Sequence, residues 1–132
     1  MLFGDKTVAL FDIWSIEHLM VGIVLAFVLN KFASNKKENL LWLLLISVFW
    51  ECCEHYFEEG LLGGKIQNWF AGTEYWANRL IGDNLVLILG YFIYKKYPKS
   101  IYFALVLSGI FLLLHLCYPS SMDIQKIAFY DL

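Results

Sequence analysis

Charged residues are scarce in this chain, and proline is almost absent. Only 17% of the 132 residues are charged, whereas 60% are hydrophobic and 18% are aromatic. A soluble domain of this size cannot bury so much apolar surface. The composition therefore argues against a soluble protein, and the length allows one domain.

Several familiar patterns are also missing. The net charge is −2 and no basic patch is present, which argues against a nucleic-acid partner. Cys52, Cys53 and Cys117 form neither a zinc-binding spacing nor a disulfide framework, so we interpret them as small packing residues. The first residues, MLFGDKTVALFDIW, lack the positive region of a signal peptide, and we expect this segment to be retained.

Four apolar runs have the length of a membrane span, about 20 residues. Each is predicted to be a helix, because an open strand would leave backbone groups unpaired in lipid. The expected fold is an all-α membrane protein, a four-transmembrane-helix bundle in which residues 1–132 form a single integral membrane domain. We place its helices at 12–32, 39–58, 75–94 and 100–118.

The lysines predict an orientation. Six of them lie in the first and third loops, whereas the middle loop has one and the terminal segments have two, Lys6 and Lys126. Short lysine-rich loops stay in the cytoplasm. We therefore expect both termini and the middle loop to face outward from a bacterial membrane.

The middle loop, EGLLGGKIQNWFAGT, combines helix-breaking glycines with apolar anchors. This combination favours an interfacial or re-entrant segment at head-group depth between the second and third helices. Such a segment would form a lid. The anchors are Leu61, Leu62, Ile66, Trp69 and Phe70.

Each predicted span carries one stripe of small or polar residues, and such a stripe marks the inside of a membrane bundle. At 100° per residue, the stripe of the second span occupies an arc of roughly 100°. All three histidines fall in the outward halves of the spans, which predicts one outward-facing pocket. Its polar members are His18, Ser47, Glu51, Glu54, His55, Glu58, Asn78, Arg79, Asp83 and His115.

These residue types suit a metal site. Mixed imidazole and carboxylate ligands favour a divalent ion such as Zn²⁺, Mn²⁺ or Fe²⁺, which activates a bound water. Arg79 suits a phosphate or carboxylate on a substrate. We predict Glu54, Asn78 and Arg79 as catalytic residues. The predicted metal ligands are His18, Glu51, His55, Asp83 and His115.

A simpler interpretation exists for several of these residues. Arg79 and Asp83, four positions apart, could form a structural ion pair, and a single histidine is often a hydrogen-bonded packing residue. Glu58, Glu59 and Glu74 could lie at head-group level and face water. Glu51 and Glu54 resist such an account, because a buried carboxylate is costly unless it is paired, protonated or metal-bound.

The chain also resembles a known family. His18, the segment WECCEH and the run EYWANRLIGDNLVLILGY are similar to small bacterial four-helix membrane proteins of the VanZ-like kind. The resemblance covers three of the four spans and implies a cell-envelope lipid or a peptidoglycan precursor as substrate. His55, Arg79 and His115 lie outside the family pattern. The matching residues are His18, Trp50, Glu51, Glu54, Trp76, Asn78, Asp83 and Gly90.

Three classes of function stay open. The first is a metal-dependent hydrolase or transferase that acts on an envelope lipid or a lipid-linked substrate. The second is a non-catalytic accessory subunit that binds lipid, haem or a partner helix. The third is a proton- or ion-coupled transporter or channel. The inner halves of the spans are almost wholly apolar, so a homo-oligomer or a larger membrane complex would have to supply its polar path.

Overall fold

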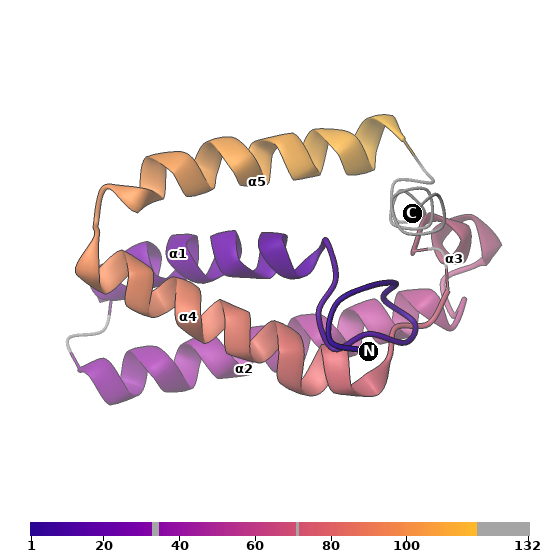
Figure 1. Ribbon diagram of the computed structural model, residues 1–132, viewed down its shortest axis with the longest axis horizontal. Coiled ribbons are helices and arrows are strands. Elements are labelled where there is room, and N and C mark those ends of the chain that lie inside the picture. The colour runs from indigo at the N-terminus through magenta and orange to yellow at the C-terminus, as the bar shows by residue number, and fades with distance from the viewer. Residues whose placement is uncertain (33–34, 71, 119–132) are drawn as a thin grey trace.

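The computed structural model describes residues 1–32, 35–70 and 72–118. The chain is all-helical, as predicted, and within the described ranges the only β feature is an isolated bridge between Phe3 and Phe11. Figure 1 shows the order of the helices. They are α1 (Ser15–Phe32), α2 (Lys36–Glu58), α3 (Gly64–Phe70), the π-helical η1 (Asn78–Gly82), α4 (Asp83–Lys96) and α5 (Ser100–Cys117).

Three helices, α1, α2 and α5, are long and apolar enough to cross a membrane. The first begins at Ser15 rather than at residue 12, because Asp12 caps it. The Asp12 carboxylate accepts the backbone N–H groups of Trp14 at 2.7 Å and Ser15 at 2.9 Å, as N-capping residues do. The second begins at Lys36 rather than at residue 39, because Asn35 caps it: the Asn35 side chain accepts the N–H of Lys37 at 2.9 Å.

The third predicted span, 75–94, consists of two helical elements. α4 has 14 residues, fewer than the roughly 20 that a crossing needs. The π-helical η1 leads into α4 without a break, so residues 76–96 are continuously helical. Single π-helical turns occur often at functional sites, and this one carries Asn78 and Arg79.

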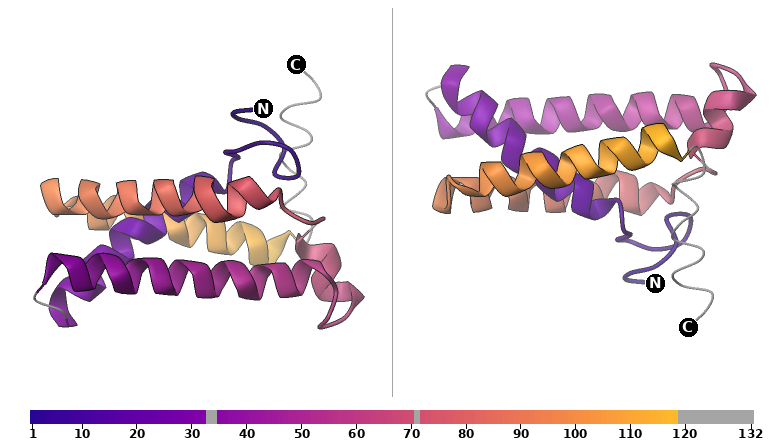
Figure 2. Two further views of the ribbon diagram at one scale, coloured as in Figure 1. Left: turned by 90° about the horizontal axis from the view of Figure 1, so that it is seen from below. Right: turned by 90° about the horizontal axis from the view of Figure 1, so that it is seen from above.

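α1 is the central helix and crosses the others obliquely, as both views in Figure 2 show. It packs most closely on α4, then on α5 and α2. The close approach requires glycine: a Cβ at Gly22 would lie 2.1 Å from the Leu87 carbonyl oxygen. A Cβ at Gly90 would lie 2.2 Å from the carbonyl oxygen of Leu19. These glycines belong to the small-residue stripes of the first and third predicted spans.

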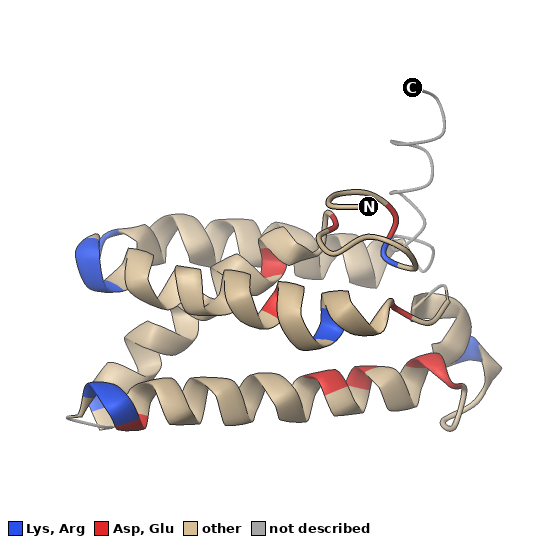
Figure 3. Ribbon diagram, turned by 60° about the horizontal axis from the view of Figure 1, so that its bottom comes forward, with Lys and Arg blue, Asp and Glu red and all other residues tan. Residues whose placement is uncertain are grey.

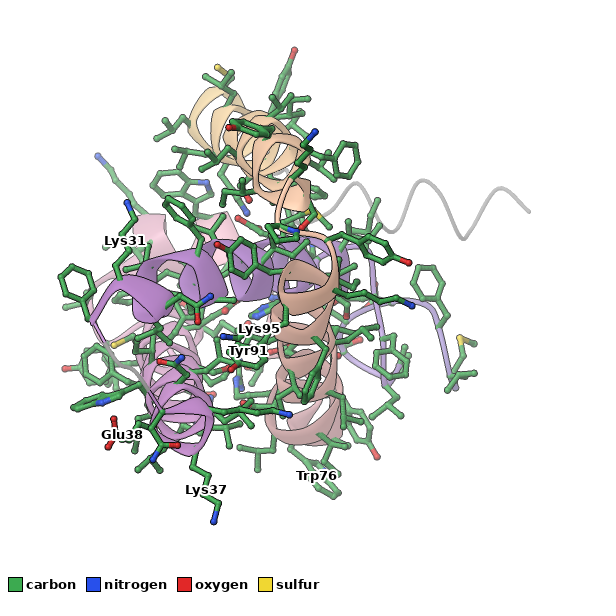
Figure 4. The ribbon with its side chains drawn as sticks, turned by 90° about the vertical axis from the view of Figure 1, so that its left-hand side faces the viewer. Lys31, Lys37, Glu38, Trp76, Tyr91 and Lys95 are labelled. Carbon is green, nitrogen blue, oxygen red and sulfur yellow. The ribbon has the colours of Figure 1, made fainter. Side chains whose placement is uncertain are left out.

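The two ends of the bundle differ. At one end lie the connections between α1 and α2 and between α4 and α5, and Figure 4 looks onto this end, where Lys31, Lys37 and Lys95 are labelled. We call it the lysine end. At the other end lie the N-terminus and α3 (Figure 1), and we call it the α3 end. α3 occupies the predicted interfacial loop and is joined to α5, because the Trp69 indole N–H donates to the His115 carbonyl oxygen at 2.8 Å.

Candidate functional site

Six buried carboxyl groups are linked in one network toward the α3 end. They come from α2, α4 and the segments just before α1 and η1, and Figure 3 shows acidic positions on neighbouring helices. Among the described residues only two basic side chains, Lys6 and Arg79, are buried. Negative groups therefore outnumber positive ones. The acidic cluster comprises Asp12, Glu51, Glu54, Glu58, Glu74 and Asp83.

Arg79 lies inside the acidic cluster and is 7% exposed. Its Nη2 atom is 2.6 Å from Glu58 Oε2 and 3.3 Å from Glu74 Oε2, and its Nε atom is 3.6 Å from Glu51 Oε2. No ion pair between Arg79 and Asp83 is present among these side chains, because Glu58 and Glu74 hold the guanidinium. Arg79 therefore links η1 to α2 through ion pairs with Glu51 and Glu58.

Lys6 reaches the acidic cluster from the N-terminal segment. Its Nζ atom is 2.8 Å from Glu58 Oε1 and also donates to the carbonyl oxygen of Phe70. The Tyr75 N–H in turn donates to the Lys6 carbonyl oxygen at 2.9 Å. Glu58 and Glu74 are thus buried beneath the N-terminal segment and do not face water at head-group level.

Asn78 bridges two acids. Its amide nitrogen is 3.2 Å from Asp12 Oδ2 and 2.7 Å from Glu74 Oε1. Burial, with the nearby carboxylates of Asp83 and Glu54, raises the pKa of Glu74 to about 10. Glu74 therefore holds a proton at neutral pH, which removes one negative charge from the acidic cluster.

Glu51 is the group with the fewest partners. It is 1% exposed, and neither carboxylate oxygen has a hydrogen-bond partner. Besides Arg79, the basic side chain beside it is His18, whose Nδ1 atom is 3.7 Å from Glu51 Oε1. The other ring nitrogen of His18, Nε2, is 3.8 Å from Asp83 Oδ2. His18 therefore lies between two buried carboxylates from different helices.

Three sets of ligand atoms lie close enough to share an ion, each set within 4.8 Å. The set Glu54–Glu58–Glu74 already contains the contacts of Lys6 and Arg79, and the set Glu51–Glu74–Asp83 contains contacts of Arg79. In the third set Arg79 contacts Glu51, but within the described residues no Lys or Arg contacts His18 or Glu54. The metal triad, as we call it, is His18, Glu51 and Glu54.

A cavity of about 670 Å³ adjoins the metal triad. Residues of α1, α2, α3 and α5 form most of its walls, with Leu87 from α4, and His18 and Glu54 are among them. On the α5 side, His115 stacks on Trp14 with ring centroids 4.4 Å apart, and its Nε2 atom is 3.6 Å from Glu17 Oε2. We call this space the lateral cavity.

No family model, curated protein or solved structure matches the chain. The resemblance to the VanZ-like kind therefore stays a prediction.

The structure brings most of the predicted ligands together but leaves two apart. His18, Glu51 and Asp83 converge, and Glu54 joins them. His55 is exposed, and its Nδ1 atom lies 3.2 Å from Arg79 Nη1. His115 lines the lateral cavity but belongs to none of the three ligand sets. The spacing between Glu51 and His55 does not bring both into one set, because α2 is buried along its Glu51–Glu54–Glu58 side.

Sequence reasoning missed Lys6, Asp12 and Glu17, and it placed Glu74 at head-group level instead of in the acidic cluster. Lys6 and Asp12 lie before the first apolar run, and nothing in a helical pattern points to them. Two signals were available in the sequence. Lys6 is a single lysine in an apolar terminal segment, and Asp12 lies three residues before Ser15 at the start of a helix. Glu17 was missed because it lies off the predicted stripe of α1.

Proposed function

We propose that the chain is an integral membrane protein with four crossings: α1, α2, η1 joined to α4, and α5. The continuous helix 76–96 supports the additional crossing, because at 1.5 Å per residue it is about 30 Å long, the thickness of the hydrocarbon core. The lysine end then faces the cytoplasm of a bacterium, and both termini and α3 face outward.

We propose further that the metal triad binds one divalent ion, Zn²⁺, Mn²⁺ or Fe²⁺. The observation that carries this proposal is Glu51, which is buried without a hydrogen bond to either oxygen. A buried carboxylate that accepts no hydrogen bond is costly, and Arg79 at 3.6 Å offsets only part of that cost. An ion between Glu51, His18 and Glu54 would remove the rest. Three protein ligands with one open position are typical of catalytic rather than structural zinc sites.

The open position would face the lateral cavity, because His18 and Glu54 are in its wall. When bound, the ion would supply a nucleophile by activating a water molecule. The reaction class we propose is hydrolysis or group transfer on an envelope lipid or a lipid-linked substrate. This class requires a water or an acceptor at the ion and a substrate held in the lateral cavity.

The other polar residues position the metal triad in this proposal. Asp83 lies beside His18 Nε2 and would fix the orientation of the ring, as carboxylates do behind metal-bound histidines. Arg79 and Asn78 are already engaged by Glu58, Glu74 and Asp12. We therefore assign Arg79 and Asn78 as positioning residues rather than as groups that touch the substrate.

The test is the metal content of protein purified in detergent and supplied with Zn²⁺, Mn²⁺ or Fe²⁺. We expect about one ion per chain in the wild type, and its loss in Glu51→Gln and His18→Ala. Glu38→Gln is the matched control, since Glu38 is exposed in the first turn of the same helix. A wild type that binds none of the three ions would overturn the metal proposal.

A second function is favoured by one observation, the lateral cavity itself. A cavity of about 670 Å³ with mostly apolar walls is in the size range of small-molecule sites. It would serve equally well in a non-catalytic subunit that holds a lipid. Wild-type protein that carries lipid but no ion would favour this accessory function over the enzyme.

A further inference from the structure

We propose that the lateral cavity holds one hydrocarbon chain of a membrane phospholipid, which enters sideways between α2 and α5 from the leaflet at the α3 end. The placement of its head group at His18 and Glu54 rests on the proposed function. The binding of the chain rests on the proposed membrane crossing but not on the metal, because the residues that would contact it are not metal ligands.

The side of the lateral cavity between α2 and α5 is open. α5 packs mainly on α1, and no substantial packing joins it to α2. Residues that line the lateral cavity are also exposed at the surface: Trp50 by 48%, Leu112 by 57% and Leu116 by 60%. In the proposed membrane this opening faces lipid, so a chain can enter without passing through water.

The lateral cavity has the length of one leaflet. Its lining extends from Trp14 to Leu25 on α1 and from Ile46 to Phe57 on α2. At 1.5 Å per residue, each stretch is about 16 Å long, close to half of the roughly 30 Å hydrocarbon core. Both stretches lie mainly in the halves of the helices nearer the α3 end, which selects the leaflet on that side.

The polarity of the lining gives the chain a direction. The deep part is mainly apolar, with Val21, Leu25, Ile46 and Leu87 beside the single hydroxyl of Ser47. The ionisable residues of the lining are all nearer the α3 end. They are Glu17, His18, Glu54 and His115. A phospholipid whose chain occupies the deep part would therefore have its ester and phosphate groups beside the metal triad.

α3 covers the outer end of the lateral cavity. Ile66, Trp69 and Phe70 line it, and Trp69 is tied to the last turn of α5 through the His115 carbonyl oxygen. On the other side, the rings of Phe57 and Phe70 lie 5.5 Å apart and connect α3 with α2. This cover closes the water side while the side between α2 and α5 stays open to lipid.

The experiment uses full-length protein in nanodiscs that contain a phosphatidylglycerol with a photoreactive group near the end of one acyl chain. After illumination, cross-linked peptides are identified by mass spectrometry. We expect labelling at the deep positions, Val21, Leu25 and Ile46. Leu25→Trp, which fills the deep part, should lower that labelling about tenfold, the scale on which a tight apolar site rejects excess volume.

Two controls keep the test decisive. Leu85→Trp places the same indole on the exposed side of α4 and should leave the labelling unchanged. If Leu25→Trp fails to fold, as judged by its melting curve, Val21→Phe replaces it. Glu51→Gln without metal should label like the wild type, so loss of the metal site and loss of chain binding are separable results. Labelling spread evenly over the exposed sides of α2 and α5, and unaffected by Leu25→Trp, would overturn the proposal.

Discussion

The lysine end and the α3 end are built from the same helices but are held together by different forces. At the lysine end, Leu29, Leu43, Leu87 and Tyr91 form an apolar core, and the lysines remain at the surface (Figure 4). At the α3 end, buried carboxylates meet two buried cations. Apolar packing is nondirectional and tolerant, whereas a buried charge depends strongly on each partner.

α2 shows the change along a single helix. Its buried residues recur every three or four positions, so they occupy one side throughout. That side carries Asn39, Leu43 and Ser47 in the first half, and Glu51, Glu54 and Glu58 in the second. A segment that would pack well as an apolar helix instead concentrates charge over two turns. Departures of this kind from local packing rules are expected at functional sites.

The largest expected effect comes from removing Arg79. Arg79→Ala would leave Glu58 without the 2.6 Å contact and Glu51 without its nearest cation. Removing one partner of a buried ion pair typically costs about 3–5 kcal/mol. Arg79→Lys should recover only part of this, because an ammonium cannot contact three carboxylates as a planar guanidinium does.

The matched control lies at the lysine end. Lys37 is exposed, and Lys37→Ala should change the free energy of unfolding by about 0.5 kcal/mol or less. Denaturation of the three variants in one detergent measures the difference. Equal losses for Arg79→Ala and Lys37→Ala would show that the two ends are not held differently.

The pH dependence of stability should also differ between the ends. The pKa of Glu74 is raised to about 10, so the folded state keeps a proton that the unfolded chain loses above its ordinary pKa near 4.5. Stability is therefore present at low pH and is lost as pH rises toward 10, by at most about 1.4 kcal/mol per pH unit for one group.

Glu74→Gln isolates this contribution. The metal-free wild type should lose stability between about pH 6 and 8, by about 2–3 kcal/mol as an upper bound, and the variant should lose less. Melting curves over that interval measure the difference in slope. Parallel curves for the two proteins would mean that Glu74 is ionised in the folded state.

The packing of the central helix, α1, can be tested with substitutions that change no charged residue. Gly22→Ala would place a Cβ 2.1 Å from the Leu87 carbonyl oxygen, and overpacking of this kind costs about 1–3 kcal/mol. Gly109 on α5 has no atom within 4 Å of such a Cβ. Gly109→Ala should therefore be neutral, or stabilising by up to about 1 kcal/mol through helix propensity. Denaturant titration of both variants checks the pair, and a tolerated Gly22→Ala would contradict the close approach of α1 and α4.

The sequence predicts the positions of the helices better than the contacts between their side chains. The apolar runs locate α1, α2 and α5, and the 100° spacing identifies Glu51, Glu54 and Glu58 as one side of α2. The π-helical η1 could not be predicted, because the spacing assumes a regular α-helix. The position of Asn78 and Arg79 relative to the acids therefore required the structure.

The partners of the acids were also beyond the sequence. Lys6 reaches Glu58 only because the N-terminal segment lies against η1, so closely that a Cβ at Gly82 would be 2.1 Å from the Leu10 carbonyl oxygen. Tertiary packing determines such contacts, and no periodicity encodes them. His55 illustrates the converse: its spacing matches the stripe, but its exposure depends on which helices pack on α2.

The last comparison is between the helix caps at the two ends, of which the Asn35 cap should have the smallest effect. Asn35 caps α2 at the lysine end, is exposed, and accepts one N–H, that of Lys37. Asp12 caps α1 at the α3 end, where it is 1% exposed, and accepts the Trp14 and Ser15 N–H groups.

Asn35→Ala should cost about 1 kcal/mol, the usual loss for an N-cap, since water can replace the missing acceptor. Asp12→Ala should cost more, because it leaves buried donors unsatisfied at about 1–3 kcal/mol each, including the Asn78 amide that now contacts Asp12. Urea titration gives both values, with Asn35→Asp as the variant that keeps a cap. Should Asn35→Ala prove the more damaging of the two, the α3 end would be the more tolerant part of the bundle, and the contrast between the ends would be reversed.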